Sequence, residues 1–321
     1  MYNYCTYFDS NYFTRGIAMY ESLKKYTKNF KLFIFAFDNR AYNLLKILNL
    51  ENVEVIPLEE FENEDLKRVK PNRSKVEYMW TCTPWVIKYV LENYNVESCT
   101  YLDADIYFFG NPEVLIKEME DKSILLTPHR YTPEYDQTMT SGIFCVQFMT
   151  FRNDEYGRTA LNWWAKACID WCYARYEDGK FGDQKYLDDW PDRFKGVHIL
   201  QNLGGGVAPW NIQQYKLEEK PFELIFYHFH GLRFYSNGLV DLCGSYRIRK
   251  EDIRNIYVPY IYHLEEIKQR LKHIDNDYDY HGSLKWKNDL RNIARRLKRR
   301  LKGTYNIYTM EDLKRIANED E

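Results

Sequence analysis

Two carboxylates stand one residue apart at the end of a short apolar run, residues 99–102 (CTYL): these are Asp103 and Asp105. Inside a protein core, both charges would repel each other unless something positive lay between them. Where a strand gives way to a loop, two such carboxylates can instead bind one hard divalent cation, and that cation can hold a diphosphate. The spacing therefore predicts a metal site, against the alternative of two ordinary solvated loop residues.

The segments around this pair predict a strand between two helices. Residues 84–94 have helical character, and residues 99–102 are prone to form a strand. After the carboxylates comes the sequence GNPE at residues 110–113, in which Asn111 suits a helix N-cap and Pro112 a first helical residue. The Asp pair is therefore expected in the loop that follows a strand.

The rest of the first 60 residues alternates between strand and helix patterns. Residues 31–37 (KLFIFAF) form an apolar run of strand length, which is typical of a parallel strand covered on both faces. This order predicts a parallel, right-handed, nucleotide-binding sheet, in which ligands bind at the carboxyl ends of the strands. Asp9 and Asp103 both fall at such ends. The other expected elements are a strand at 53–56 and helices at 15–26, 39–48 and 156–176.

Five segments, in this order along the chain, resemble the Asp-x-Asp glycosyltransferases of the GT-A fold, most closely glycosyltransferase family 8 and its bacterial lipopolysaccharide-type relatives. They are residues 6–12 (TYFDSNY), 101–105 (YLDAD), 142–148 (GIFCVQF), 181–187 (FGDQKYL) and 228–231 (HFHG). The resemblance implies an α/β, Rossmann-like fold with a mostly parallel central sheet, helices on both faces and a helical C-terminal appendage. We expect a GT-A domain over residues 1–250 and a helical extension over 251–321.

The resemblance also assigns roles to residues. It implies that Asp103, Asp105 and His228 bind the metal, with Asp103 shared between metal and ribose, and that Asp183 and Gln184 lie at the transferred sugar. Such a mixed carboxylate and imidazole set suits manganese, or magnesium, better than calcium. The donor is expected to be a nucleoside-diphosphate sugar, with a UDP-sugar favoured. Its expected contacts are Thr6, Asp9, Asn11, Tyr12, Lys88, Asp103, Ala104, Gly231 and Arg233.

Several positions depart from the family pattern. Phe234 stands where the family commonly has a lysine, and the neighbouring Arg233 carries the charge instead. Cys145 and Gly206 stand where relatives have asparagine, which alters the sugar and acceptor pockets. The helix before the metal strand lacks the family's arginine, and three cations could take that role: Lys88, Arg73 and Lys75.

The expected reaction is metal-dependent transfer of a hexosyl group, with retention of anomeric configuration, to a glycan or a lipid-linked acceptor in cell-surface glycan biosynthesis. Two alternatives remain. A sugar nucleotidyltransferase would carry a glycine-rich basic loop after the first strand, but this chain has no glycine before Gly16. A catalytically silent, transferase-like binding module is disfavoured by the intact Asp103, Asp105 and His228.

Composition sets wider bounds. The 321 residues are 45% apolar, which is enough for one large domain with an appendage. A net charge of -2 gives no reason to expect nucleic-acid binding. The seven cysteines form no Cys-x-x-Cys pair and suit reduced thiols. With no signal peptide and no apolar stretch of ~18 residues, the sequence predicts a cytoplasmic protein.

The C-terminal region contains a basic amphipathic segment, residues 284–302, in which nine cations oppose one acid. Apolar residues recur between these cations at helical spacing. One interpretation is a helix that binds an anionic membrane surface, which would place the protein peripherally on the inner face of a membrane. The other is a solvated helix that packs its apolar stripe on the catalytic domain.

Overall fold

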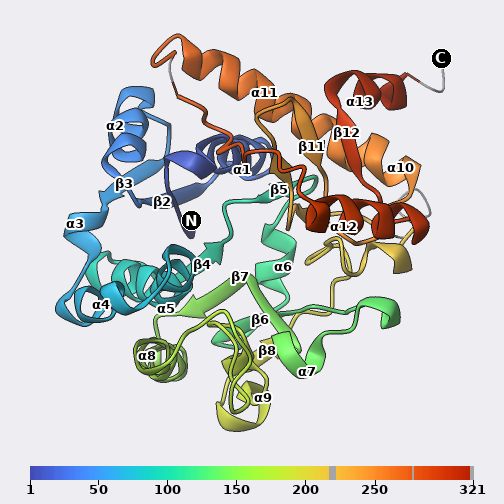
Figure 1. The fold of residues 1–321 in the computed structure, drawn as a ribbon. Coiled ribbons are helices and arrows are strands. Elements are labelled where there is room, and N and C mark those ends of the chain that lie inside the picture. The colour runs from blue at the N-terminus through green and yellow to red at the C-terminus, as the bar shows by residue number, and fades with distance from the viewer. Residues whose placement is uncertain (217–221, 277, 319–321) are drawn as a thin grey trace.

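The computed structural model describes residues 1–216, 222–276 and 278–318. At its centre lies a seven-stranded sheet with the order β3-β2-β1-β4-β7-β6-β8 (Figure 1). The four strands from β3 to β4 are parallel, β7 is antiparallel to β4 and to β6, and β8 is parallel to β6. The predicted α/β fold with a mostly parallel sheet is therefore confirmed. The strands span Tyr2–Phe8 (β1), Phe30–Ala36 (β2), Val53–Pro57 (β3), Ser98–Leu102 (β4), Ile124–Pro128 (β6), Phe144–Arg152 (β7) and Val197–Ile199 (β8).

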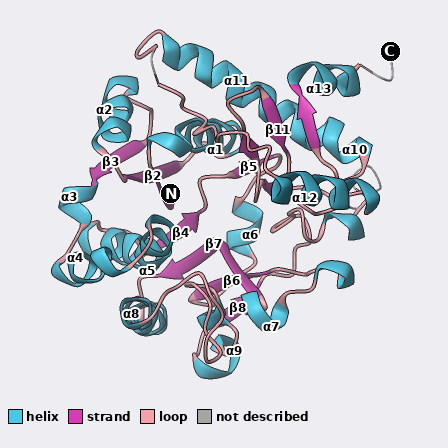
Figure 2. Cartoon of the chain, viewed as in Figure 1, coloured by secondary structure: helices cyan, strands magenta, loops and turns pink. Residues whose placement is uncertain are grey.

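Helices cover both faces of this sheet (Figure 2). On strand β2, Leu32 and Ile34 face one core while Phe33 and Phe35 face the other, which explains its uninterrupted apolar sequence. The first core is covered by α1 (Phe13–Tyr26), α2 (Asn39–Leu48) and α11 (Val258–Lys272), and the second by α5 (Lys75–Asn93) and α8 (Glu155–Asp170). Shorter helices are α3 (Leu58–Phe61), α4 (Glu64–Val69), α6 (Glu113–Lys117), α7 (Thr138–Ser141), α9 (Trp190–Arg193) and α10 (Lys250–Asp252).

Two helices differ in length from the sequence-based expectation. The helix expected from residue 84 begins at Lys75, because Ser74 and Glu77 form a capping box there and Pro84 lies inside the helix. The helix expected over 156–176 ends at Asp170. Beyond it, the Arg73 guanidinium donates hydrogen bonds to the carbonyl oxygens of Ile169 and Cys172, which holds the following segment in an extended path.

The C-terminal third packs onto the preceding chain. Strand β12 (Ile307–Thr309) joins β10 (Arg233–Phe234) and β11 (Leu239–Asp241) in a three-stranded antiparallel sheet. Leu264 of α11 and Leu313 of α13 (Met310–Ala317) lie in the same core as α1. Figure 1 shows α11 beside α1. The extension is thus continuous with the catalytic core, and the boundary at residue 250 stays a prediction.

The basic segment forms a shorter helix than expected, α12 (Leu290–Leu301). It begins after Asp289, whose side chain accepts a hydrogen bond from the backbone N–H of Asn292 at 2.9 Å. Upstream, Leu284 instead bonds to strand β10, since its N–H donates to the Phe234 carbonyl at 2.9 Å. The N-terminal third of the expected helix is therefore extended chain.

One buried ion pair attaches helix α12 to strand β11, and the apolar residues of the helix face the solvent. The buried Arg299 forms a bidentate pair with Asp241 of β11, at 2.6 and 2.8 Å. Leu290 lies nine residues before Arg299, about two and a half turns at 3.6 residues per turn, so it projects from the opposite side. Leu290, Leu297 and Leu301 are 86%, 55% and 90% exposed. The interpretation in which this stripe packs on the catalytic domain is therefore wrong for α12.

We expect the Arg299→Met substitution to lower the free energy of unfolding by about 3–5 kcal/mol, because it leaves the Asp241 carboxylate buried without its partner. Urea denaturation would measure this loss. The double substitution Arg299→Met with Asp241→Leu should recover much of it, since no buried charge remains. Arg295→Met, on the exposed part of the same helix, serves as control and should change stability by less than about 0.5 kcal/mol. Equal effects of the two single substitutions would contradict the assignment.

Candidate active site

A small antiparallel pair of strands brings His228 to the Asp pair. Strand β5 (Ile106–Phe108) follows Asp105 directly, and it pairs with β9 (Phe226–His228) so that Ile106 lies opposite His228. The N–H of Phe229 donates to the Asp105 carbonyl at 2.9 Å, which extends the pairing by one residue. Two segments about 120 residues apart in sequence thus meet at the carboxyl end of β4.

Asp103, Asp105 and His228 form a cluster that fits a divalent cation. His228 Nε2 lies 3.2 Å from Asp105 Oδ1 and 3.7 Å from Asp103 Oδ2, and one ligand atom from each residue lies within 4.8 Å of the others. All three side chains are largely buried, with exposed fractions of 6%, 14% and 23% for His228, Asp105 and Asp103. Two carboxylate oxygens and one imidazole nitrogen are ligand types that could hold a divalent metal ion.

The electrostatics of this cluster call for a positive charge at its centre. Burial, followed by the Asp105 charge, raises the pKa of Asp103 to about 6 even though His228 opposes the shift. Burial would lower the pKa of His228, but the carboxylates of Asp105 and Asp103 outweigh it and raise that pKa well above its usual value. The negative charge of the carboxylates contributes to both shifts, and a bound divalent cation would neutralise it.

Neighbouring groups fix the orientation of the cluster. The Tyr101 hydroxyl donates to Asp103 Oδ1 at 2.8 Å, and the Asp103 N–H donates to the Gln147 carbonyl of β7 at 3.0 Å. The Trp210 ring packs edge-on against His228, with ring centroids 5.5 Å apart. Trp210 was not among the residues predicted from sequence. Such supporting contacts commonly hold metal ligands in place.

The turn after β1 lies beside this cluster, as the order of the parallel strands requires. Asp9 is buried, and its carboxylate accepts hydrogen bonds from the N–H groups of Asn11 and Tyr12 at 3.0 and 3.1 Å. Burial, followed by the Asp105 charge, raises the pKa of Tyr12, which places this ring near the metal-ligand candidates. Tyr12 is surrounded by protein atoms on part of its surface but remains 39% exposed, and Asn11 is exposed as well, so both are accessible to a ligand, whereas Asp9 shapes the turn.

The other residues predicted to contact the donor differ in burial and in backbone conformation. Thr6 is fully buried in β1, and its hydroxyl has no hydrogen-bond partner among the described residues. Ala104 is buried between the two aspartates. Gly231 has a φ of +80°, a backbone conformation that favours glycine, at the turn after β9. Arg233 is exposed on β10.

Lys88 is directed away from the cluster. It lies late in α5, where its ammonium group contacts Asn162 of α8 at 2.5 Å and Glu92 at 2.9 Å. Since α5 runs back along the sheet before β4 begins, its late residues lie toward the edge opposite Asp103. Lys75, at the start of α5, does reach this region, where it forms an ion pair with Asp9. The structure thus favours Lys75 over Lys88 for the donor-side cation.

Asp183 and Gln184 approach the site from the loop after α8. Asp183 is 2% exposed, and its Oδ2 has no partner among the described residues. Burial, with a contribution from the Asp103 charge, raises the pKa of Asp183 to about 7. Gln184 Nε2 donates to the Ser141 carbonyl at 2.6 Å. Burying a carboxylate near a second carboxylate costs folding free energy. The presence of Asp183 here therefore indicates a functional role.

Gln147 is a further candidate that sequence reasoning did not single out. It is fully buried in β7, yet neither atom of its side-chain amide has a partner in the described part of the chain. It lies close to Gly206, where an added Cβ would come within 3.3 Å of Gln147 Nε2 and 2.7 Å of Thr127. A buried amide without partners costs stability, which suggests that a ligand or water satisfies it.

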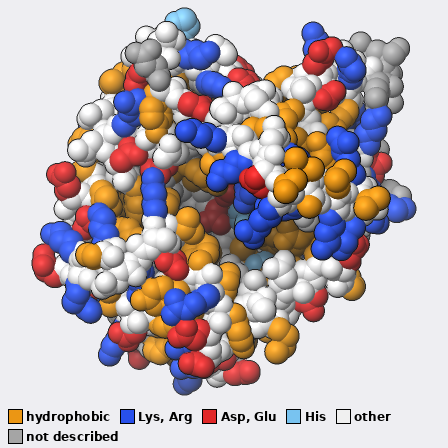
Figure 3. Space-filling view, viewed as in Figure 1, with side chains coloured by type: hydrophobic (Ala, Val, Ile, Leu, Met, Phe, Trp, Pro, Cys, Tyr) orange, Lys and Arg blue, Asp and Glu red, His pale blue; other side chains and the backbone are white. Residues whose placement is uncertain are grey.

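The space-filling view shows a hollow near the centre of one face (Figure 3). Acidic and histidine side chains lie deep in it, and Lys and Arg side chains gather along its rim. Among the described helices, none has the length and apolar composition needed to cross a membrane.

The architecture is that of glycosyltransferases of the GT-A type. The chain is similar to the galactosyltransferase LgtC, solved in complex with donor and acceptor sugar analogs, with a TM-score of 0.52, 12% identity, and coverage of 82% of this chain and 95% of LgtC. It is also similar to the glycosyltransferase GlyE of Streptococcus pneumoniae TIGR4, with a TM-score of 0.51, 12% identity, and coverage of 87% of this chain and 65% of GlyE. At these identities the likeness shows the fold alone.

The family follows from closer relatives. The chain is 32% identical over 279 residues to the uncharacterized protein YfnD of Bacillus subtilis (strain 168), which covers 82% of this chain and 89% of YfnD. It is 27% identical over 292 residues to YfnF of the same organism, covering 86% and 96%. No family model matches the sequence. The chain therefore belongs to the family of YfnD.

Proposed function

We propose that this chain is a metal-dependent glycosyltransferase of family 8 type that transfers a hexosyl group from a nucleoside-diphosphate sugar, with a UDP-sugar favoured, to a glycan or lipid-linked acceptor. The observation that carries the proposal is the Asp103, Asp105 and His228 cluster, because it lies at the carboxyl end of β4 within a GT-A fold. The galactosyltransferase activity in the name of LgtC is consistent with a hexosyl donor.

In this proposal Asp103, Asp105 and His228 would hold manganese or magnesium, which neutralises the charge that develops on the leaving diphosphate. The turn carrying Asn11 and Tyr12 binds the base and ribose, and Asp9 keeps that turn in shape through its two backbone hydrogen bonds. Lys75 and Arg233 supply positive charge on the donor side. The roles of Thr6, Ala104 and Gly231 as donor contacts are part of the same proposal.

Asp183 and Gln184 are proposed to flank the anomeric carbon of the donor sugar. The buried Asp183 carboxylate stabilises positive charge at this carbon, and the Gln184 amide is held in place by the Ser141 carbonyl. Because we assign Asp183 to the reacting carbon, and no other described residue is assigned as a base for activating an acceptor, we propose retention. Gln147, whose backbone carbonyl accepts a hydrogen bond from the Asp103 N–H, and the neighbouring Gly206 are proposed to shape the sugar pocket.

We further propose that the protein acts in the cytoplasm at the inner face of a membrane, in cell-surface glycan biosynthesis. Support comes from α12, whose exposed Leu290, Leu297 and Leu301 lie among lysines and arginines. In this scheme residues 1–250 carry the chemistry and residues 251–321 carry the surface contact.

The reaction can be tested with a panel of nucleotide sugars and manganese. We expect metal-dependent donor hydrolysis for one nucleotide sugar, with a first-formed sugar of the same anomeric configuration as the donor in proton NMR spectra. The opposite anomer would contradict retention. Release of pyrophosphate from a sugar phosphate and a nucleoside triphosphate would instead identify a sugar nucleotidyltransferase. Donor binding with no turnover of any donor would favour a binding module.

A further inference from the structure

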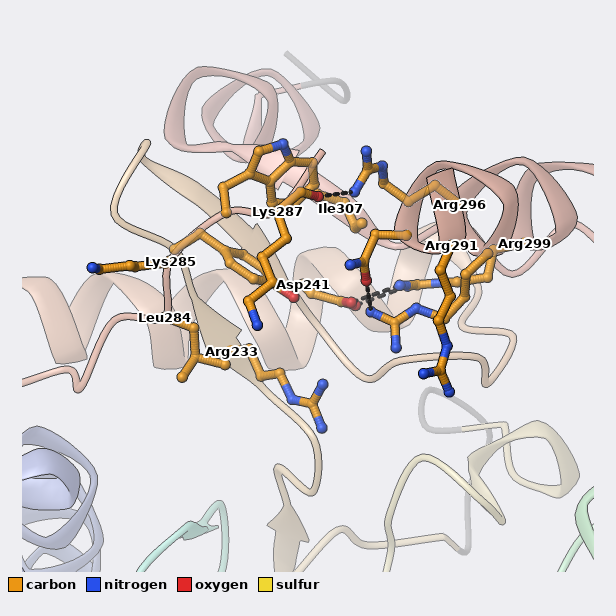
Figure 4. Close-up of a pocket in the computed structure, with 13 residues that line it drawn as sticks. Arg233, Asp241, Leu284, Lys285, Lys287, Arg291, Arg296, Arg299 and Ile307 are labelled. Carbon is orange, nitrogen blue, oxygen red and sulfur yellow. Dashed lines mark hydrogen bonds and ion pairs between the residues drawn. The ribbon is translucent and has the colours of Figure 1, made fainter. Parts of the chain in front are cut away.

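A second cavity, of about 470 Å³, lies between α12 and the β10–β11–β12 sheet (Figure 4). Cations dominate its lining: Arg233, Lys285, Lys287, Arg291, Arg295 and Arg296. Figure 4 shows Arg233 and Lys287 directed into the same space, whereas Lys285 points away from it. The cavity thus gathers side chains from β10, from the segment before α12 and from α12 itself.

The positive charge of this cavity is not balanced. Its only acidic lining residue is Asp241, and both carboxylate oxygens of Asp241 already accept hydrogen bonds from Arg299. Arg233, Lys287 and Arg291 make no ion pair with any residue in the described part of the chain, and Arg295 donates only to Asn292. The cavity is open to solvent, and several like charges that line one recess raise the local positive potential, which attracts anions.

The cavity also contains an aromatic wall. The Trp286 ring meets the Tyr235 ring edge-on, with centroids 4.9 Å apart, and the Arg296 guanidinium lies 4.5 Å from the centre of the Trp286 ring. Aromatic faces beside cations suit a ligand that combines a sugar ring with a phosphate group.

The cavity and the exposed leucines of α12 lie on different sides of the helix, so a flat membrane surface cannot contact both. The cavity-lining cations of α12, Arg291, Arg295 and Arg296, lie on the same side of the helix as Arg299, while Leu290 and Leu301 project from the opposite side. A flat bilayer that covers the leucines would leave the cavity facing away from it. The cavity therefore needs an anion that can enter the space between α12 and the sheet.

The cavity adjoins the proposed active site. Arg233 lies on β10, five residues after His228, and its side chain is directed into the cavity (Figure 4). A ligand held here would lie within reach of the segment that carries the metal-ligand candidate His228.

We propose that this cavity binds a phosphate group of the acceptor, and that the acceptor is a phosphate-bearing glycan. This inference rests on the proposed function, because it names the substrate class of the same transfer reaction. Lys287, Arg291 and Arg295 hold the phosphate, while Arg233 stays with the donor. Trp286 contacts the adjoining sugar, and a neighbouring hydroxyl of the acceptor extends toward the donor sugar.

The test compares two sets of charge-removing substitutions in the full chain. The cavity variant carries Lys287→Gln, Arg291→Gln and Arg295→Gln, which leaves Arg233 and the Arg299 pair intact. The control variant removes three exposed cations far from the cavity: Lys25→Gln, Lys28→Gln and Lys46→Gln. The probes are a short glycerol phosphate oligomer, a neutral maltooligosaccharide, and vesicles of phosphatidylglycerol. UDP with manganese is the probe of the donor site.

We expect the wild-type and control proteins to bind the glycerol phosphate oligomer, and the cavity variant to bind it about tenfold more weakly or worse. Binding should weaken as salt increases, and the maltooligosaccharide should not compete. Binding of UDP with manganese should be unchanged in both variants. Thermal unfolding confirms the fold of each variant, and the three single substitutions replace the triple variant if it is unstable.

Other results would overturn the inference. Parallel loss of UDP binding in the cavity variant would assign the cavity to the donor. Equal binding of the neutral oligosaccharide would assign the cavity to uncharged glycans. Loss of vesicle binding in the cavity variant, without any binding of the oligomer, would assign the cavity to lipid headgroups. Failure of the proposed function is a separate outcome, in which the wild-type protein binds no UDP with manganese whatever the cavity binds.

Discussion

Replacing Asp105 by asparagine is expected to abolish sugar transfer, with a loss of roughly 1,000-fold or more, because a metal that stabilises the leaving diphosphate contributes several kcal/mol to the transition state. The amide keeps the shape of the side chain but removes the charge that the metal needs. The protein should remain folded, because Asp103 still lies beside His228 and the repulsion between the two carboxylates is relieved, which offsets part of the lost contact between Asp105 and His228. Transfer rates and thermal unfolding measure the two effects.

The matched control is Asp121→Asn, which removes a carboxylate that is 85% exposed on the surface. It should leave both transfer and stability as in the wild-type protein. Wild-type turnover of donor by the Asp105→Asn protein would show that the chemistry occurs elsewhere in the molecule.

Replacing Leu290, Leu297 and Leu301 together by glutamine is expected to weaken binding to anionic vesicles by a hundredfold or more. Burying each leucine in a lipid surface would contribute up to about 1.5–3 kcal/mol, and each nearby Lys or Arg about 1 kcal/mol. Because these leucines are exposed in the protein, their replacement should not destabilise the fold. Co-sedimentation with phosphatidylglycerol vesicles measures the loss, and neutral phosphatidylcholine vesicles should bind weakly throughout.

A control variant replaces three exposed apolar residues on other elements, Val76, Val114 and Met139, by glutamine. It should bind vesicles as the wild-type protein does. Donor hydrolysis should be the same in all three proteins, since the leucines lie outside the proposed active site. Unchanged vesicle binding by the leucine variant would contradict a membrane role for α12. Deletion of residues 284–321 would be a poor test, because β12 and the buried Leu313 belong to the packed structure.

Much of the fold could be predicted from sequence because its signals are local. The apolar runs of β2 and β4 and the helical spacing in α1 and α2 each lie within a few residues, and their alternation predicts the parallel half of the sheet. The position of Asp103 at the end of a strand follows from the same pattern. The prediction that His228 belongs to this site came from the resemblance to glycosyltransferases. The short strands β5 and β9 that bring it there lie about 120 residues apart and carry no local signal.

Other features could not be predicted because they depend on tertiary contacts. The amphipathic pattern of residues 284–302 shows which residues share a face, but the Arg299 and Asp241 pair decides which face turns inward. Gln147 sits in an apolar strand and reads as an ordinary strand residue until its unpartnered amide is seen. The direction of Lys88 toward α8 likewise depends on Asn162, which lies 74 residues further along the chain.

The most direct test of the central claim is calorimetric titration of UDP into the wild-type and Asp105→Asn proteins, with and without manganese. The account predicts that the wild-type protein binds UDP in the presence of manganese, and that removal of the metal or of the Asp105 charge abolishes that binding. Equally tight binding of UDP by both proteins, or binding that does not depend on the metal, would contradict the assignment of Asp103, Asp105 and His228 as the metal site of a glycosyltransferase.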